Sequence, residues 1–140
     1  MDQFPSAQHV ASWAGVCPGN HESAGKRLAG TARKGNVWLR RSLCQAAWAA
    51  SHAKDTYLAA RFRRLTARKG KQRAIVAVAH TMLVMVYHML KTDQPYRELG
   101  ADYLDRLNAD YLKRSLLKRL ERLGVQVTVH SVDHPVTLSG

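Results

Sequence analysis

A long apolar segment in the middle of the chain places the strongest constraint on its fold. Ala74–Leu90 is mostly aliphatic, but His80, Thr81 and His88 interrupt it. A membrane-spanning helix needs about 20 residues with few polar groups. We therefore predict a buried core helix from Lys71 to about Lys91 and no membrane span. A chain of 140 residues is long enough to form one domain around such a core.

Apolar residues at helical spacing predict further helices on both sides of this segment. Their ends carry the usual signals, which are Ser6 and Asn36 as N-caps, Gly70 as a helix breaker and Gly124 as a C-cap. Asp93–Gly100 contains a proline and reads as a connector. The helices that we expect, besides the core helix, are Ala7–Trp13, Asn36 to about His52, Asp55–Arg68 and Ala101–Leu123.

The last part of the chain has a different pattern. Val125–Val132 alternates apolar and polar residues with a period of two, which is typical of a β-strand. The strand has no obvious partner in the sequence. We therefore predict a mainly α fold, a single helical domain at residues 1–124 that is followed by a short C-terminal β-strand or tail at residues 125–140.

The segment from Gly15 to Gly35 contains five of the nine glycines and no apolar periodicity. We predict a long Gly-rich loop near the N-terminus of the domain. A loop of this length inside a compact domain is usually either functional or disordered. Glycine also permits a close approach of the backbone to a ligand.

The chain is strongly basic, and its charge is concentrated in the first part. It has 22 Lys and Arg against 10 Asp and Glu, a net charge of +12. Residues 1–80 hold 14 of the basic and 3 of the acidic side chains, whereas residues 81–140 are nearly neutral. Such a charge favours an anionic partner, most commonly nucleic acid. An anionic membrane and plain solubility are the alternatives; we expect DNA and no membrane.

The Gly-rich loop and the helix that follows it form the first candidate phosphate site. Backbone N–H groups of a glycine loop and the positive end of a helix dipole both attract phosphate oxygens. Between Lys26 and Arg41 there are six basic residues and no acidic one. The alternative is a solvated basic loop with ordinary turn glycines. The candidate binding residues here are Lys26, Arg27, Arg33, Lys34, Gly35, Asn36, Arg40 and Arg41.

A second basic stripe follows on the helix predicted at Asp55–Arg68. We expect Arg61, Arg64 and Arg68 to point outward and to contact phosphates, with Lys69, Lys71 and Arg73 beyond them. A solvated helix face is the alternative. We expect the aromatic residues of this region to be core residues rather than base-stacking platforms; they are Tyr57, Phe62 and the tryptophans.

Ser23 lies inside the Gly-rich loop. A serine hydroxyl can attack a phosphodiester when a base removes its proton and cations stabilise the developing charge. Lys26 and Arg27 are near enough in sequence for the second task. His21 or Glu22 can serve the first, or a nearby arginine can lower the pKa of the hydroxyl. On the residues alone, a turn or cap serine is the more common interpretation.

The sequence does not predict a metal site. Cys17 and Cys44 are isolated from each other and have no zinc-ligand spacing, so we expect free, buried thiols. The seven histidines are scattered along the chain. The acidic residues Asp102, Asp105 and Asp110 lie on a predicted helix without acidic partners elsewhere. A self-contained two-metal nuclease is therefore not supported.

Three motifs occur in a fixed order near the N-terminus. They are Ala14-Gly-Val-Cys-Pro18, Glu22-Ser-Ala-Gly-Lys26 and Lys34-Gly-Asn-Val-Trp-Leu-Arg40. This ordered combination closely resembles the C-terminal transposase domain of the insertion-sequence 110/116/902 family. The similarity extends through the helices to about Leu123 and so covers nearly the whole chain.

The resemblance implies a role in DNA transposition and site-specific recombination. Members of the family are guided by a structured bridge RNA, and their N-terminal RuvC-like domain carries an acidic Mg²⁺-binding cluster. Their C-terminal domain supplies a serine for a covalent link to DNA, and Ser23 is the matching residue here. The resemblance also favours Lys34, Gly35, Asn36 and Arg40 as supporting residues. The implied partners are DNA, the guide RNA, a RuvC-like domain in cis or trans, and further copies of the full-length protein in a homo-oligomer.

The RuvC-like domain has no counterpart in this sequence. We therefore expect a truncated or split transposase, or an isolated domain, with no cofactor of its own and with Mg²⁺ only where the missing domain is present. Whether the chain is itself an enzyme stays open, and the alternative is a nucleic-acid-binding fragment without catalytic activity. The N-terminus does not resemble a signal peptide, and we expect a cytoplasmic, nucleoid-associated protein of a prokaryote.

Overall fold

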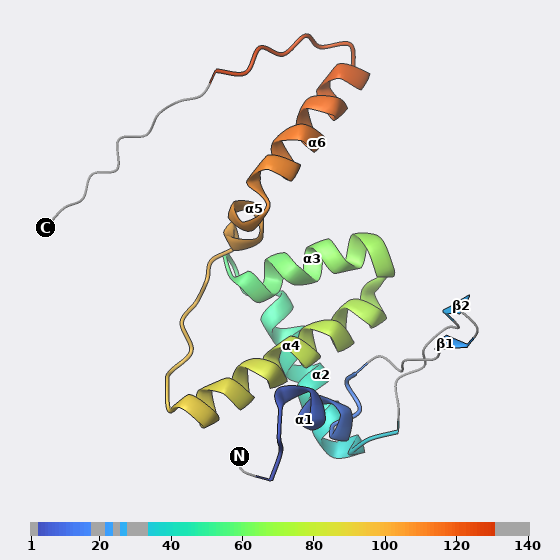
Figure 1. Cartoon of the computed structure of the whole chain (residues 1–140), viewed down its shortest axis with the longest axis vertical. Helices are drawn as coiled ribbons and strands as arrows, with labels where there is room; N and C mark the ends of the chain where they lie inside the picture. Colours follow the sequence, from blue (N-terminus) through green and yellow to red (C-terminus); the bar gives the residue numbers. More distant parts are fainter. Residues whose placement is uncertain (1–2, 18–21, 24–25, 28–33, 131–140) are drawn as a thin grey trace, which may run out of the picture. The chain divides into compact units, whose positions relative to one another are not determined.

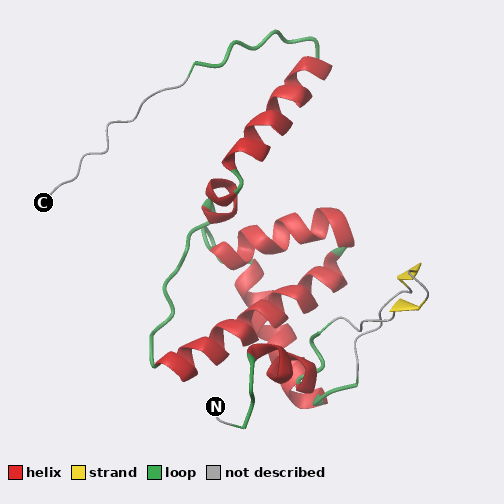
Figure 2. Ribbon diagram, viewed as in Figure 1, coloured by secondary structure: helices red, strands yellow, loops and turns green. Residues whose placement is uncertain are grey.

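The computed structural model describes residues 3–17, 22–23, 26–27 and 34–130, and it is mainly α-helical, as predicted (Figures 1 and 2). The chain divides into two compact units, residues 1–104 and residues 105–140. Its elements are α1 (Ala7–Trp13), β1 (Glu22–Ser23), β2 (Lys26–Arg27), α2 (Val37–Ser51), α3 (Tyr57–Lys69), α4 (Lys71–Thr92), α5 (Tyr103–Leu107) and α6 (Ala109–Arg122).

α4 is the central helix of the first unit. α1, α2 and α3 all pack against it, and α2 also contacts α3 (Figure 1). Its buried side chains include Val78, Leu83 and Tyr87, and alanines such as Ala47 of α2 let the helices approach closely. By length and composition alone α4 is also the one described helix that could cross a membrane. Its packing against three helices agrees with the predicted core helix.

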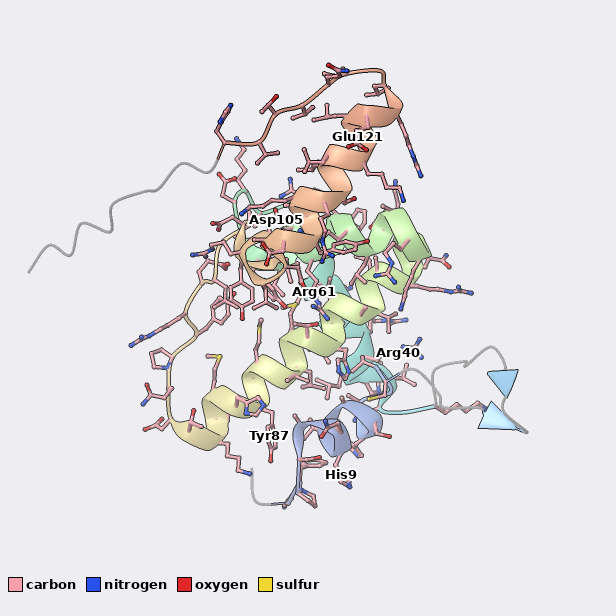
Figure 3. All side chains as sticks on the ribbon, turned by 45° about the horizontal axis from the view of Figure 1, so that its top comes forward. His9, Arg40, Arg61, Tyr87, Asp105 and Glu121 are labelled. Carbon is pink, nitrogen blue, oxygen red and sulfur yellow. The ribbon has the colours of Figure 1, made fainter. Side chains whose placement is uncertain are left out.

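The segment before α1 is held against the end of α4. The Tyr87 hydroxyl donates to the Phe4 carbonyl at 3.2 Å, and Figure 3 shows Tyr87 reaching toward this segment. The rings of Phe4 and Trp13 lie 5.7 Å apart between centroids. Ser6 occupies the N-cap position, but its side chain makes no cap hydrogen bond and pairs instead with His9 Nδ1.

Local signals set the ends of α2, α3 and α4. Asn36 caps α2 as predicted, because its side-chain oxygen accepts from the Leu39 N–H at 3.0 Å. Thr56 caps α3 in the same way, so this helix begins two residues later than predicted. Gly70 separates α3 from α4 with a φ of +80°, a conformation that glycine adopts without strain.

The connector after α4 is tied to the start of α3. The Glu98 carboxylate accepts hydrogen bonds from the backbone N–H of Tyr57 at 2.8 Å and of Gly100 at 3.0 Å, and from the Tyr96 hydroxyl at 3.0 Å. Burial raises the pKa of Glu98, but these hydrogen bonds together outweigh it and lower the pKa. Burial and the same carboxylate raise the pKa of Tyr96 to about 12.

The last part of the chain differs from two expectations. The helix predicted at Ala101–Leu123 is interrupted, because Asn108 leaves the helical conformation and separates α5 from α6. Asparagine favours such breaks because its side chain competes for backbone hydrogen bonds. Gly124 follows α6 with a φ of +77°, as a C-cap glycine should. Residues 125–130, the described part of the strand expected at Val125–Val132, contain no strand.

Candidate nucleic-acid interface

Ser23 lies in a minimal β-hairpin within the predicted Gly-rich loop. β1 and β2 are antiparallel, and their register places Ser23 opposite Lys26 and Glu22 opposite Arg27 (Figure 2). The structure therefore brings the candidate nucleophile next to two of the predicted cationic positions in the backbone pairing. The predicted residues Arg33 and His21 lie outside the described part of the chain.

The two ends of the segment that contains this hairpin meet each other. The Asn36 N–H donates to the Trp13 carbonyl at 3.0 Å. Gly35 lies directly on the backbone of Gly15, where a Cβ on Gly35 would come within 2.3 Å of the Gly15 nitrogen. Because no real Cβ tolerates such a distance, the closure requires glycine at position 35. We call this closed pair of ends, Trp13–Gly15 with Gly35–Asn36, the stem.

The amino end of α2 begins at the stem. Asn36 uses its side chain to cap the helix, and it thereby orients the first turn of α2, whose dipole is positive at this end. Lys34 and Arg41 are exposed, whereas Arg40 is half-buried. Burial raises the pKa of the nearby Cys44 thiol, and the positive charge of Arg40 lowers it in part. The predicted cations at this end of α2 are thus gathered beside the stem.

The three predicted arginines of α3 do not share one environment. Arg64 and Arg68 are exposed, as expected. Arg61 is half-buried, and its guanidinium donates to the Tyr57 hydroxyl at 3.1 Å and lies 6.0 Å from the Tyr57 ring centroid. The expectation that Arg61 points outward is therefore wrong. Helical spacing in the sequence is the feature that predicts this position. Arg61 is four residues from both Tyr57 and Leu65 and so shares their face of the helix.

Other cations of this surface were missed or treated as secondary. Arg63 of α3 is exposed, although the sequence analysis did not single it out. Lys69, Lys71 and Arg73 are also exposed around the turn between α3 and α4. The predicted stripe contains only Arg61, Arg64 and Arg68. A prediction that includes every cation of this helix also includes Arg63.

A thiol–imidazole contact lies at the beginning of the Ser23 segment. Cys17 Sγ is 3.7 Å from His80 Nδ1 on α4. Burial raises the pKa of Cys17, while burial and then the charge of Arg61 lower the pKa of His80. Both groups are therefore favoured in their neutral forms. A neutral thiol is a poor nucleophile, and the two cysteines are free and half-buried rather than fully buried.

The tryptophans contradict the expectation that they are core residues. Trp38 is 76% exposed, and Trp13 and Trp48 are about half exposed. Tyr57 is buried and Phe62 packs against the core, as expected. α2 turns the stripe formed by Leu39, Leu43 and Ala47 toward the core, and Trp38 lies outside that stripe.

In the second unit, α6 carries a basic pocket that the sequence analysis did not identify. The pocket is open, has a volume of about 340 Å³, and is lined by Ser115, Lys118, Arg119 and Arg122. Spacings of three and four residues place these side chains on one side of the helix. The near-neutral charge of residues 81–140 concealed them, because the balancing acidic residues lie mainly before α6.

The described residues do not fit a magnesium site. Among them, no three His, Cys, Asp or Glu side chains are grouped as metal ligands. Asp102 and Asp105 have interactions of their own within the protein. A cluster of carboxylates of the kind that binds Mg²⁺ is thus missing from residues 3–17 and 34–130.

Comparison with known proteins agrees with the motifs around Ser23. Residues 1–63 match the sequence model of the family described as transposase IS116/IS110/IS902, a range that includes the hairpin, the stem and α2. No curated protein and no solved structure is significantly similar to the chain. The match supports a role in DNA transposition with DNA as a partner, whereas the resemblance from residue 64 to Leu123 stays a prediction. Residues 1–63 of this chain are thus similar to the IS116/IS110/IS902 transposase family.

Proposed function

We propose that this chain is the DNA-binding, serine-bearing portion of an insertion-sequence transposase. The family match supports a transposition role. The single observation that carries the serine assignment is the placement of Ser23 in a hairpin opposite Lys26, within a segment whose ends are closed by the stem. A closed stem brings the two ends of this segment together, and holding reacting groups in place favours a productive geometry.

Ser23 acts as the nucleophile in this proposal. Its oxygen forms a bond to phosphorus, and the bond between phosphorus and one deoxyribose oxygen breaks. The hydroxyl proton leaves to a base, for which His21 and Glu22 are the candidates, and the departing deoxyribose oxygen takes up a proton. Lys26 and Arg27 stabilise the added negative charge on the phosphate. Lys34 and Arg40 hold the neighbouring DNA or RNA backbone.

The chain works together with other components. A RuvC-like domain in cis or trans supplies the acidic, Mg²⁺-binding half of the active site, and a bridge RNA selects the DNA. The full-length assembly is a homo-oligomer in the cytoplasm, associated with the nucleoid. These partners are proposed from the family resemblance, which the match at residues 1–63 supports.

The test is a search for the covalent intermediate. The chain, the RuvC-like domain, the guide RNA and end-labelled DNA are combined, and protein–DNA adducts are separated under denaturing conditions. We expect Ser23→Ala to abolish the adduct and recombination while DNA binding stays within about twofold, because only the attacking oxygen is removed. Ser12→Ala, a serine of α1 before the stem, is the matched control. Recombination at the normal rate by Ser23→Ala would refute the nucleophile assignment.

A second candidate function is nucleic-acid binding without catalysis. It is favoured by the exposed cations of α2, α3 and the start of α4. In that case Ser23→Ala would bind as the parent chain does, and the parent chain itself would form no adduct in the reconstituted reaction.

A further inference from the structure

The side chain of Trp38 does not pack in the core of the protein. It lies in the first turn of α2, two residues after Asn36, whose N–H closes the stem. Its side chain is 76% exposed, and the preceding Val37 is 69% exposed. α2 contacts α3 and α4 through another side of the helix, which includes Leu39, Leu43 and Ala47. A large aromatic surface in water is costly, and it needs an explanation outside the core.

The surroundings of Trp38 are cationic. The Arg41 guanidinium lies 6.0 Å from the centre of the Trp38 ring, one helical turn along α2. Lys34 is exposed just before the helix, and Arg40 lies in the same turn as Arg41. No acidic residue occurs between Ser23 and Lys54. The aromatic ring thus lies beside one guanidinium, in a stretch of the chain that has several cations and no acidic residue, and such groups attract phosphate.

We propose that Trp38 and Arg41 form a platform on which an unpaired nucleobase stacks. Every nucleobase has a flat apolar face, and single-stranded nucleic acids bind proteins by stacking bases on aromatic rings beside a basic groove. Arg41 adds a cation next to the ring, and the guanidinium plane itself stacks on bases. The neighbouring cations neutralise the phosphates on either side of that base.

The position of this platform gives it a role at the Ser23 site. Strand exchange exposes unpaired nucleotides, and the platform lies beside the stem that closes the segment containing Ser23. A base held by Trp38 keeps its own strand at the amino end of α2, where this segment ends. This inference rests on the proposed nucleic-acid-binding function, because a stacked base is useful only when the strand that carries it is bound.

Two measurements on the full chain test the platform. In a Trp13→Phe, Trp48→Phe variant, Trp38 is the single remaining tryptophan of three. Adding a dT15 oligonucleotide to this variant quenches its fluorescence, because stacking on a base quenches indole emission. In the parent background, Trp38→Ala weakens dT15 binding by roughly 5- to 100-fold, the range of one aromatic stack, and changes affinity for a blunt 15-base-pair duplex by less than twofold.

Two further variants separate stacking from other roles of the side chain. Trp38→Phe keeps an aromatic face and retains most of the dT15 affinity. Trp38→Leu keeps apolar bulk without an aromatic face and binds as weakly as Trp38→Ala. Val37→Ala is the matched control, because it removes another exposed apolar side chain of the same turn and leaves dT15 affinity unchanged. Circular dichroism confirms that each variant is folded.

Each outcome identifies what fails. One outcome is that dT15 binds at low salt, the fluorescence of Trp38 is not quenched, and Trp38→Ala binds dT15 as tightly as the parent chain. That outcome refutes the platform, while the proposed nucleic-acid binding stands. If Trp38→Leu binds like the parent chain, the side chain makes an apolar contact with another protein surface or strand, and the stacking proposal is overturned. If neither dT15 nor the duplex binds at low salt, the proposed function itself is wrong.

Discussion

At the scale of single residues, two glycines show how the Ser23 segment is held. Gly35 was expected to let the backbone approach a phosphate. The structure gives it another role, because its Cα lies against the backbone of Gly15 and leaves no room for a side chain. The neighbouring hydrogen bond from the Asn36 N–H to the Trp13 carbonyl closes the same stem. Gly35 therefore has a structural role, because it allows the two ends of the Ser23 segment to meet.

We predict that Gly35→Ala destabilises the first unit. The added Cβ would meet the backbone of Gly15, which must move, and overpacking of this kind costs about 1–3 kcal/mol. Urea unfolding followed by circular dichroism measures the loss. Ala49→Ser also adds one heavy atom but lies on the exposed side of α2, so its free energy of unfolding stays within about 0.5 kcal/mol of the parent chain. Equal stabilities of the two variants would contradict the close contact.

The arginines show a limit of residue-by-residue inference. Arg61, Arg64 and Arg68 were treated as equivalent on the basis of charge. Arg61 instead donates to the Tyr57 hydroxyl, and its charge adds to burial in lowering the pKa of His80 on α4. Charge alone does not distinguish a guanidinium that contacts phosphate from one that packs on an aromatic ring.

At the scale of elements, the connector after α4 stabilises the start of α3 from a distance. Thr56 caps one N–H of the first turn, and Glu98 accepts from the N–H of Tyr57. A carboxylate at the amino end of a helix also interacts favourably with the helix dipole. The connector therefore completes a helix that precedes it by about forty residues.

We predict that Glu98→Gln lowers stability at neutral pH and that the difference from the parent chain disappears in acid. The pKa of Glu98 is below its ordinary value in the folded chain, so its contribution is present above the unfolded-state pKa and is lost as pH falls through the folded-state pKa. Thermal unfolding between pH 7 and pH 2 measures this. Glu121→Gln, an exposed control on α6, should show no such convergence, and a pH-independent difference for Glu98→Gln would contradict the charged cap.

At the scale of the whole molecule, the charge is carried by the helical core unit. Between Ser23 and Thr92 the one acidic residue is Asp55, while cations are exposed on α2, on α3 and at the start of α4. α6 in the other unit has its own basic pocket. The nearly neutral balance of residues 81–140 therefore hides a local concentration of cations.

We predict that duplex DNA binding weakens steeply with salt. The logarithm of the affinity should fall by about 0.9 per logarithmic unit of salt for each phosphate contacted. Arg64→Gln with Arg68→Gln should reduce that slope, whereas Arg97→Gln, a charge change in the connector, should leave it unchanged. Titrations from about 50 to 200 mM salt measure the slopes. A flat response, or equal slopes for all variants, would contradict phosphate binding by α3.

Local sequence patterns predict the helices up to the connector and the motif that contains Ser23, but not the break between α5 and α6. Apolar residues at helical spacing, the Asn36 cap and the Gly70 break act over a few residues, so a short stretch of sequence is enough to recognise them. The stem at Gly15 and Gly35, the Glu98 cap of α3 and the exposure of Trp38 become visible only in the tertiary structure. These features depend on which faces of α1 to α4 meet, and that choice is made by packing between residues far apart in the chain.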